Sequence, residues 1–197
     1  EQPTEAPADK PTQAPTPDTG NDNPDHVTAT PAPDSYTLGG FLSKIISAEK
    51  KTVELCGTTN KKLKKLNVKA TVTIDGAAYK VTSIGKAAFK NIKTLKKLTI
   101  GKNVTTIGDK AFYNCVKITS ITIPSKVSKI GKQAFYKCKK LKKIIIKTSR
   151  LTKSKVGKNA FKGIQSDATI KVPKKKVKTY TQMLRARGVG KKVTIKK

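Results

Sequence analysis

The nine residues IGDKAFYNC, from Ile107 to Cys115, are one of four near-copies of a single phrase in this chain. The others are IGKAAFKNI from Ile84, IGKQAFYKC from Ile130 and VGKNAFKGI from Val156, so that the phrase returns after 23, 23 and 26 residues. Self-similarity at a fixed period between 20 and 50 residues is typical of proteins that stack similar structural units. The sequence therefore predicts a solenoid with coils of about 23 residues.

A second phrase repeats with the same period. Its copies are LKKLNV, LKKLTI, ITSITI and LKKIII, which begin at residues 63, 95, 118 and 141. The first copy is set apart by the insertion TVTIDGAAYKV, in which Asp75-Gly76 between β-rich residues predicts a hairpin turn. ATIKVP, with Ile170 and Val172, is a late and degenerate copy. Spacing of the type L-x-x-L-x-L indicates a leucine-rich repeat.

The apolar positions of each coil are expected to stack. A short strand should point Leu98 and Ile100 inward and Thr99 outward, while Gly108 is expected to permit a backbone bend. Since adjacent strands lie about 4.8 Å apart, equivalent side chains should form columns. We interpret the repeated phrase as core packing without a chemical role. The predicted columns are Phe89, Phe112, Phe135 and Phe161; Ala88, Ala111, Ala134 and Ala160; and Ile92, Cys115, Cys138 and Ile164.

The combined pattern L-x-x-I-x-I-x-x-x-V-x-x-I-G-x-x-A-F-x-x-C resembles the BspA-like leucine-rich repeats of bacterial surface proteins, over roughly residues 63–172. The resemblance implies a mainly β solenoid of the α/β class, here with four to five coils and few short helices. It also implies export, display at the cell surface, and roles in adhesion or host interaction. Because the family motif is structural, it brings no catalytic residues with it.

Four segments are expected from the change in composition along the chain. Residues 1–36 hold most of the ten prolines and predict a disordered linker rich in Pro, Thr and Asp. Residues 37–82 should form an N-terminal β cap with the first strand and the hairpin, because an open stack must protect its end. Residues 83–172 hold the repeats, and residues 173–197 form a C-terminal cap.

The C-terminal cap is expected to contain a helix and a strand. Pro173 would occupy the first helical position, with Val177, Tyr180 and Leu184 on one face and Gly188 ending the helix. The closing stretch KKVTIKK then predicts an edge strand flanked by lysines, a common protection against unwanted strand pairing.

Charge is distributed very unevenly along the chain. Residues 1–37 contain seven acids and one base, a net of −6, whereas residues 38–197 contain 42 bases and five acids, a net of +37. A body of one charge sign attracts polyanions, which include nucleic acid, wall polymers, anionic glycans and anionic lipid. Specific base reading favours Arg and stacking aromatics, so we expect no specific nucleic-acid partner. The main lysine clusters are Lys61-Lys62, Lys64-Lys65, Lys139-Lys140, Lys142-Lys143 and Lys174–Lys176.

Few residues in the repeats suit catalysis or metal binding. The one histidine, His26, falls in the expected linker, and no C-x-x-C or phosphate-binding glycine motif occurs. Cys115 and Cys138 share one column and are interpreted as buried thiols, with a disulfide between them as the lesser alternative, while Cys56 has no evident mate. We therefore expect a non-enzymatic protein without a metal or cofactor, and no run of apolar residues is long enough to cross a membrane.

Function is expected on the exposed strand face, because a solenoid commonly binds its partners along its concave side. Ordinary solvated strand residues are the alternative reading of this face. The candidate ligand-binding residues are Lys65, Asn67, Lys97, Thr99, Ser120, Thr122, Lys143, Ile145, Thr169 and Lys171.

Three hypotheses follow. The first is a secreted or cell-surface binding and adhesion module that contacts host or cell-wall polyanions, glycans or proteins. The second is a structural or wall-attachment accessory domain of a larger surface protein. The third, motivated by charge alone, is non-specific nucleic-acid binding.

Overall fold

The structure is a computed structural model that describes residues 35–197. The expected linker therefore lies outside the described residues, apart from Ser35 and Tyr36, and so does His26. Those two residues belong to strand β1 (Ser35–Leu38), which begins within the range expected for the linker.

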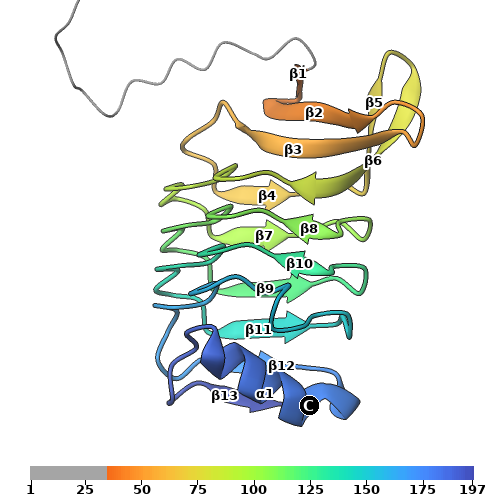
Figure 1. The fold of residues 1–197 in the computed structure, drawn as a ribbon. Coiled ribbons are helices and arrows are strands. Elements are labelled where there is room, and N and C mark those ends of the chain that lie inside the picture. Colours follow the sequence, from red (N-terminus) through yellow and green to blue (C-terminus); the bar gives the residue numbers. More distant parts are fainter. Residues whose placement is uncertain (1–34) are drawn as a thin grey trace, which may run out of the picture. The chain divides into compact units, whose positions relative to one another are not determined.

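The N-terminal part is an antiparallel sheet that continues into the solenoid. β1 pairs with β2 (Phe41–Ser47), and β2 pairs with β3 (Thr52–Thr58), both antiparallel. β3 then pairs in parallel with β6 (Ala77–Ile84), the first strand of the repeating ladder. The meander thus covers one end of the stack, as Figure 1 shows.

The predicted hairpin is present. β5 (Thr71–Ile74) pairs antiparallel with β6, and the loop between them consists of Asp75 and Gly76. Their φ angles are 47° and 73°, and a two-residue hairpin loop of this type requires positive φ at both positions. The Asp-Gly pair supplies this conformation at little steric cost.

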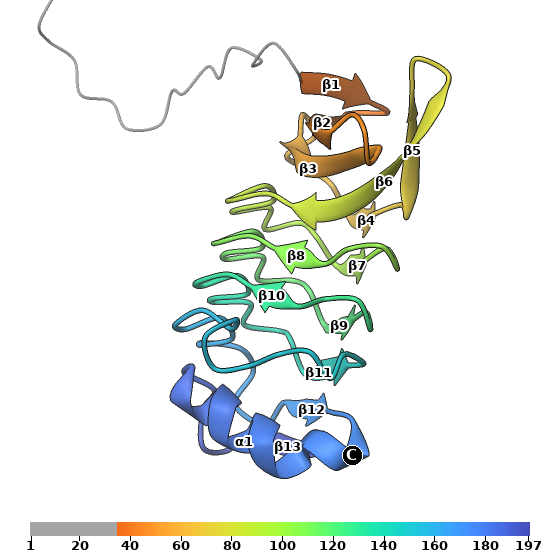
Figure 2. The same ribbon diagram turned by 45° about the vertical axis from the view of Figure 1, so that its right-hand side comes forward.

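Two parallel ladders run through the coils. One consists of β6, β8 (Thr106–Ile107) and β10 (Lys129–Ile130), and a bridge from Ile130 to Val156 extends it. The other is interrupted between β7 and β9, and Figure 2 shows the two ladders on separate sides of the stack. Its strands are β4 (Lys65–Asn67), β7 (Lys97–Thr99), β9 (Ser120–Ile123), β11 (Lys143–Ile146), β12 (Thr169–Lys171) and β13 (Thr194–Lys196).

The solenoid fold is confirmed, and the stack makes about six turns rather than four to five. The difference arises at the two ends. β4 belongs to a coil that the hairpin insertion separates from the others, and β13 adds one more parallel strand beyond β12.

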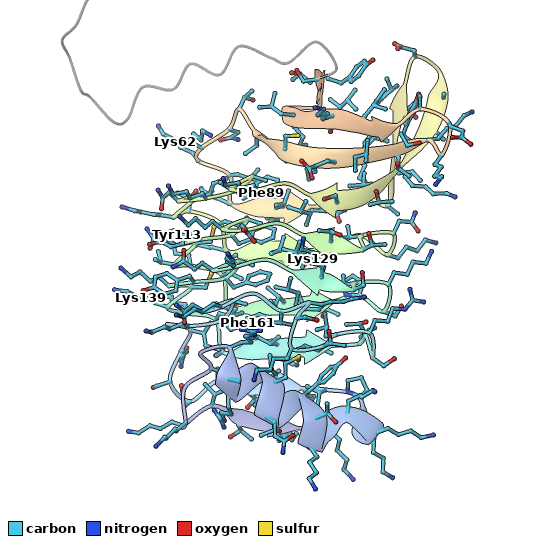
Figure 3. The ribbon with its side chains drawn as sticks, in the orientation of Figure 1. Lys62, Phe89, Tyr113, Lys129, Lys139 and Phe161 are labelled. Atoms are coloured by element: carbon cyan, nitrogen blue, oxygen red, sulfur yellow. The ribbon has the colours of Figure 1, made fainter. Side chains whose placement is uncertain are left out.

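The predicted phenylalanine column forms the centre of the core. Neighbouring rings from Phe89 through Phe112 and Phe135 to Phe161 are stacked, with centroids 5.5, 5.2 and 5.3 Å apart and planes within 11° of parallel. All four side chains are completely buried. Figure 3 shows Phe89 and Phe161 inside the stack, several coils apart. The repeated phrase therefore places identical side chains in a dry column.

Gly108 serves a different purpose from the expected backbone bend. Its φ is not in the left-handed region, but a Cβ at this position would lie 2.7 Å from the carbonyl carbon of Gly85 in the preceding coil. Gly131 and Gly157 contact their preceding coils even more closely. The glycine recurs at this position of the repeat because the backbones of neighbouring coils approach closely there.

The C-terminal end of the stack is covered by a helix. A 3₁₀ turn (Lys174–Lys176) follows Pro173, and α1 (Val177–Ala186) begins only after it, so Pro173 is not the first residue of the α-helix. Tyr180, Met183 and Leu184 are buried, while Val177 is only partly so. Gly188, with φ of 94°, follows the helix as predicted.

Helix α1 packs against the coil from Ile130 to Val156, which at 26 residues is three residues longer than the others. The Tyr180 hydroxyl donates a hydrogen bond to the Thr148 carbonyl (3.0 Å) and accepts one from the Leu151 amide (3.1 Å). The Arg187 side chain donates from Nε to the Lys153 carbonyl at 3.0 Å. The three extra residues of this coil therefore lie in the loop that anchors the cap.

Candidate functional site

The ten candidate residues form one surface, which we call the strand strip. In the parallel registers, Lys65 lies beside Lys97, and Asn67 lies beside Thr99. Further along, β9, β11 and β12 are in register, so the remaining candidates form two more columns. These columns are Ser120, Lys143 and Thr169, and Thr122, Ile145 and Lys171.

The side chains of the strand strip reach solvent to different degrees. Seven of the ten are exposed, whereas Thr122, Ile145 and Thr169 are partly buried. Because buried residues such as Leu98, Ile121 and Ile144 alternate with them, the strip rests on the core of the solenoid. The result is a fixed surface of hydroxyls and ammonium groups with one aliphatic side chain.

The strand strip is divided into two hydrogen-bonded sheets. β4 and β7 form a two-stranded sheet, and β9, β11, β12 and β13 form a four-stranded one. β7 and β9 are nevertheless neighbours in space. The interruption means that the sheet hydrogen bonds do not continue from Thr99 to Thr122.

Two further residues extend the strip, and sequence reasoning missed them. β13 places Thr194 beside Thr169 and Lys196 beside Lys171. The signal was available, because VTIK at residues 193–196 repeats ATIK at residues 168–171. The last strand was predicted as an edge, but it also continues the candidate surface.

A second surface lies on the turns between the two ladders. We call it the lysine edge. Figure 3 shows two of its members, Lys62 and Lys139, at the same edge of the stack as Tyr113, whereas Lys129 lies away from that edge. All of its side chains are exposed. Its residues are Lys61, Lys62, Lys64, Lys93, Lys96, Lys117, Lys139, Lys140 and Lys142.

Backbone hydrogen bonds hold these turns in register. The amides of Lys96 and Lys97 both donate to the Lys64 carbonyl, at 2.9 and 3.2 Å. Two coils further on, the amides of Lys142 and Lys143 donate in the same way to the Thr119 carbonyl, at 3.0 and 3.2 Å. The lysines therefore extend from turns whose backbone is hydrogen-bonded to the neighbouring coil.

A pair of tyrosines lies next to the lysine edge. Tyr113 and Tyr136 stack with centroids 5.2 Å apart and planes 16° from parallel, and both are partly buried. The Lys137 ammonium lies over the Tyr136 ring, 5.6 Å from its centroid. Asn114 Nδ2 donates to Asn91 Oδ1 at 3.1 Å, so polar side chains also form a ladder here. Sequence reasoning missed this pair, although both residues follow the repeated phenylalanine directly.

The three cysteines are free thiols, and the prediction of buried thiols at positions 115 and 138 is confirmed. Cys115 Sγ donates to the Phe89 carbonyl at 3.0 Å, and Cys138 Sγ donates to the Phe112 carbonyl at 3.3 Å. Burial raises the pKa of Cys115 to about 12 and raises the pKa of Cys138 as well. Both thiols are thus protonated at neutral pH and unsuited to nucleophilic chemistry.

A hollow of about 440 Å³ lies between the N-terminal meander and the hairpin. Leu38, Phe41, Leu55, Val72 and Val81 supply most of its apolar lining. In residues 35–197, no cluster of three or more His, Cys, Asp or Glu side chains is arranged to hold a metal ion. The same part of the chain has no helix with the length and apolarity to span a membrane.

A sequence model of the BspA type leucine rich repeat region matches residues 59–185 in six copies. The chain belongs to this family. The match begins before the first LKK phrase and ends inside α1. The BspA-type repeat therefore includes the coil that the hairpin interrupts and most of α1, but not β13.

Solved structures agree with this assignment. A leucine-rich repeat protein from Bacteroides ovatus is 32% identical with a TM-score of 0.61, and the match covers 71% of this chain and 35% of that one. A leucine-rich cell surface protein from Faecalibacterium prausnitzii is 30% identical with a TM-score of 0.55, covering 72% and 37%. A Bacteroides capillosus protein, 23% identical with a TM-score of 0.58 and coverage of 71% and 99%, shares the fold.

The BspA-type chain spans about a third of the length of the first two of these proteins. Among proteins with curated functions, none matches it significantly.

Proposed function

We propose that this BspA-type protein is a non-catalytic binding and adhesion module displayed at the bacterial cell surface, and that the strand strip contacts a glycan or a protein. The observation that supports this most directly is the register of the strip, which places hydroxyl, amide and ammonium groups in columns on a rigid sheet. Such a surface needs little reordering when it binds, which favours affinity. The Faecalibacterium relative, a cell surface protein, supports the location.

The composition of the strip suits a polar partner. Its members donate and accept hydrogen bonds through Thr and Ser hydroxyls and the Asn67 amide, and lysines flank them. Ile145 supplies one apolar contact near the middle of β11. A carbohydrate chain or an extended polypeptide could follow the columns from β7 to β13.

The test is binding of the wild-type chain to a glycan array and to a panel of extracellular matrix proteins. The triple variant Asn67→Ala, Thr99→Ala, Thr122→Ala should bind at least tenfold more weakly to whichever glycan or matrix protein the wild-type chain binds. The matched control, Thr73→Ala with Thr179→Ala, changes two exposed threonines outside the strip and should bind as wild type does. Retention of no ligand by the wild-type protein would contradict the proposal.

A second function is favoured by the length comparison. The match covers only about a third of the Bacteroides ovatus and Faecalibacterium proteins. A chain of this kind could therefore act as a structural or wall-attachment segment of a larger surface protein. Deleting residues 35–197 from the complete protein in its host should then release the protein from the cell surface. Loss of adhesion with the protein still attached would favour the first function instead.

A further inference from the structure

We propose that the lysine edge is a second binding site, separate from the strand strip, for a linear polymer that carries tetrahedral oxyanions along its length. Sulfate esters on a polysaccharide and phosphodiesters in a wall polymer share this chemistry. The inference rests on the proposed role as a surface binding module, and adds a particular face and a class of partner to it.

The arrangement of charge supports an elongated ligand. The lysines recur from coil to coil along the stacking direction, and stacked side chains of adjacent coils are separated by about one strand spacing, as the 5.2–5.5 Å between ring centroids shows. The segments that supply them, residues 61–64, 93–96, 117–119 and 139–142, contain no acidic residue. A single small anion would meet only a few of these ammonium groups, whereas a polymer parallel to the axis meets many.

The chemistry of the donors points to oxyanions held by charge. The segments that form the lysine edge contain no Arg, whose planar fork suits bidentate recognition, and Lys instead presents a point charge. Exposed side chains on long stems adapt to sulfate or phosphate groups with imperfect spacing. Binding of this kind releases counterions and weakens steeply as salt concentration rises.

The tyrosine pair argues against a nucleic-acid chain in the same place. Proteins that bind single strands use free aromatic faces, on which the bases stack. Here Tyr113 and Tyr136 cover one face of each other, and the Lys137 ammonium lies over the Tyr136 ring. One face of each ring is therefore already covered, which leaves less aromatic surface for stacking bases and favours a saccharide or polyol backbone over a nucleobase chain.

The experiment compares two variants of the full chain with equal changes in net charge. The edge variant replaces Lys139, Lys140 and Lys142 by Glu. The control variant replaces Lys129, Lys153 and Lys155 by Glu. These three are also exposed, but Lys129 lies in β10, and the other two lie in the loop that leads to Val156 of the same ladder. Matching Lys→Gln variants serve if charge reversal perturbs folding, which thermal melting would show.

Affinities for a heparin fragment and for poly(glycerol phosphate) are measured over a series of salt concentrations. We expect the edge variant to lose at least tenfold in affinity. Its plot of log K against log salt concentration should also become less steep by about two to three, since each lost phosphate or sulfate contact reduces the steepness by about one. The control should change less than threefold. Binding of only one polymer would identify the source of the oxyanions and would also support the proposal.

Three results would overturn it: equal losses in both variants, no binding of either polymer by the wild type, or tighter binding of single-stranded DNA than of both polymers. Equal losses would indicate general attraction to a basic body. None of these results bears on the strand strip, because the glycan and matrix-protein binding of the alanine variant tests that surface independently.

Discussion

Gly131 lies directly against Gly108 of the preceding coil, so closely that a Cβ on Gly131 would be 2.5 Å from the Gly108 carbonyl carbon. It would also lie 2.4 Å from the Asp109 amide nitrogen. Real Cβ atoms do not approach backbone this closely, and the backbone on both sides is held by interstrand hydrogen bonds.

The first prediction follows from this contact. Gly131→Ala should force two coils apart and lower the free energy of unfolding by about 3 kcal/mol or more, in the upper range for overpacking. Gly190→Ala is the control, because a Cβ there meets no atom within 4 Å. Urea denaturation followed by circular dichroism measures both, and an equal, small effect would contradict the close approach.

The second prediction concerns the phenylalanine column. Phe135 stacks on two rings, Phe112 and Phe161, whereas Phe161 stacks on one among the four. Replacement by Leu keeps most of the buried apolar area but removes ring stacking, which contributes about 0.5–1.5 kcal/mol per pair. Phe135→Leu should therefore be more destabilising than Phe161→Leu by about 1 kcal/mol in the same denaturation assay. Equal losses would mean that burial alone accounts for the column.

The third prediction concerns the buried thiols at high pH. Burial raises the pKa of Cys115 to about 12, above the ordinary value of 9.0, and the pKa of Cys138 also rises. Above pH 9 the unfolded chain therefore loses thiol protons that the folded chain keeps, so the unfolded state binds fewer protons and stability falls as pH rises toward 12. The decline is at most about 1.4 kcal/mol per pH unit for each thiol.

Comparison with a Cys115→Ala, Cys138→Ala variant isolates this effect, because lysine titration is common to both proteins. The difference in unfolding free energy between wild type and variant should shrink as pH rises from 8 to 10.5. Parallel curves would show that the thiols ionise in the folded protein as readily as in the unfolded one.

The fourth prediction concerns backbone conformation. Gln133 has φ of 55°, and the equivalent residue of the next coil, Asn159, has φ of 60°. Asn tolerates the left-handed region better than Gln does, so Gln133→Asn should stabilise the protein by about 0.5 kcal/mol. Gln133→Val, with a β-branched side chain, should cost more than 1 kcal/mol. Thermal melting of both variants tests this, and a destabilising Asn would refute the explanation.

The periodicity of the sequence was sufficient to predict the solenoid and its core columns. The residues Phe89, Phe112, Phe135 and Phe161 recur at fixed positions, and stacking of identical coils leaves only one arrangement for them. The hairpin at Asp75-Gly76 was predictable because local turn chemistry alone determines it. The strand strip followed from simple alternation along each strand.

Other features depend on contacts that no local pattern reveals. The role of Gly108 is set by the distance to another coil. Nothing in Lys110 or Lys137 themselves predicts their left-handed backbone. The equivalent residues of other coils give a partial indication, because Asn159 corresponds to Lys110, and Asn91 and Asn114 correspond to Lys137. The sequence shows the lysine edge only as separate clusters of lysines, because they form one surface only when the turns stack. The interruption between β7 and β9 has no counterpart in the sequence that we can identify.

The hydrogen bonds of Tyr180 with Thr148 and Leu151 have a consequence for how this array can change in length. The helix binds the longer loop of the coil from Ile130 to Val156, so deleting that coil, or inserting a 23-residue unit after it, would separate the helix from the loop that it contacts. Gain or loss of a 23-residue unit should therefore be tolerated upstream, between Ile84 and Ile130, where each period is interchangeable with the next. Natural variation in the number of turns would accordingly be concentrated in the middle of the molecule, with both ends inherited unchanged.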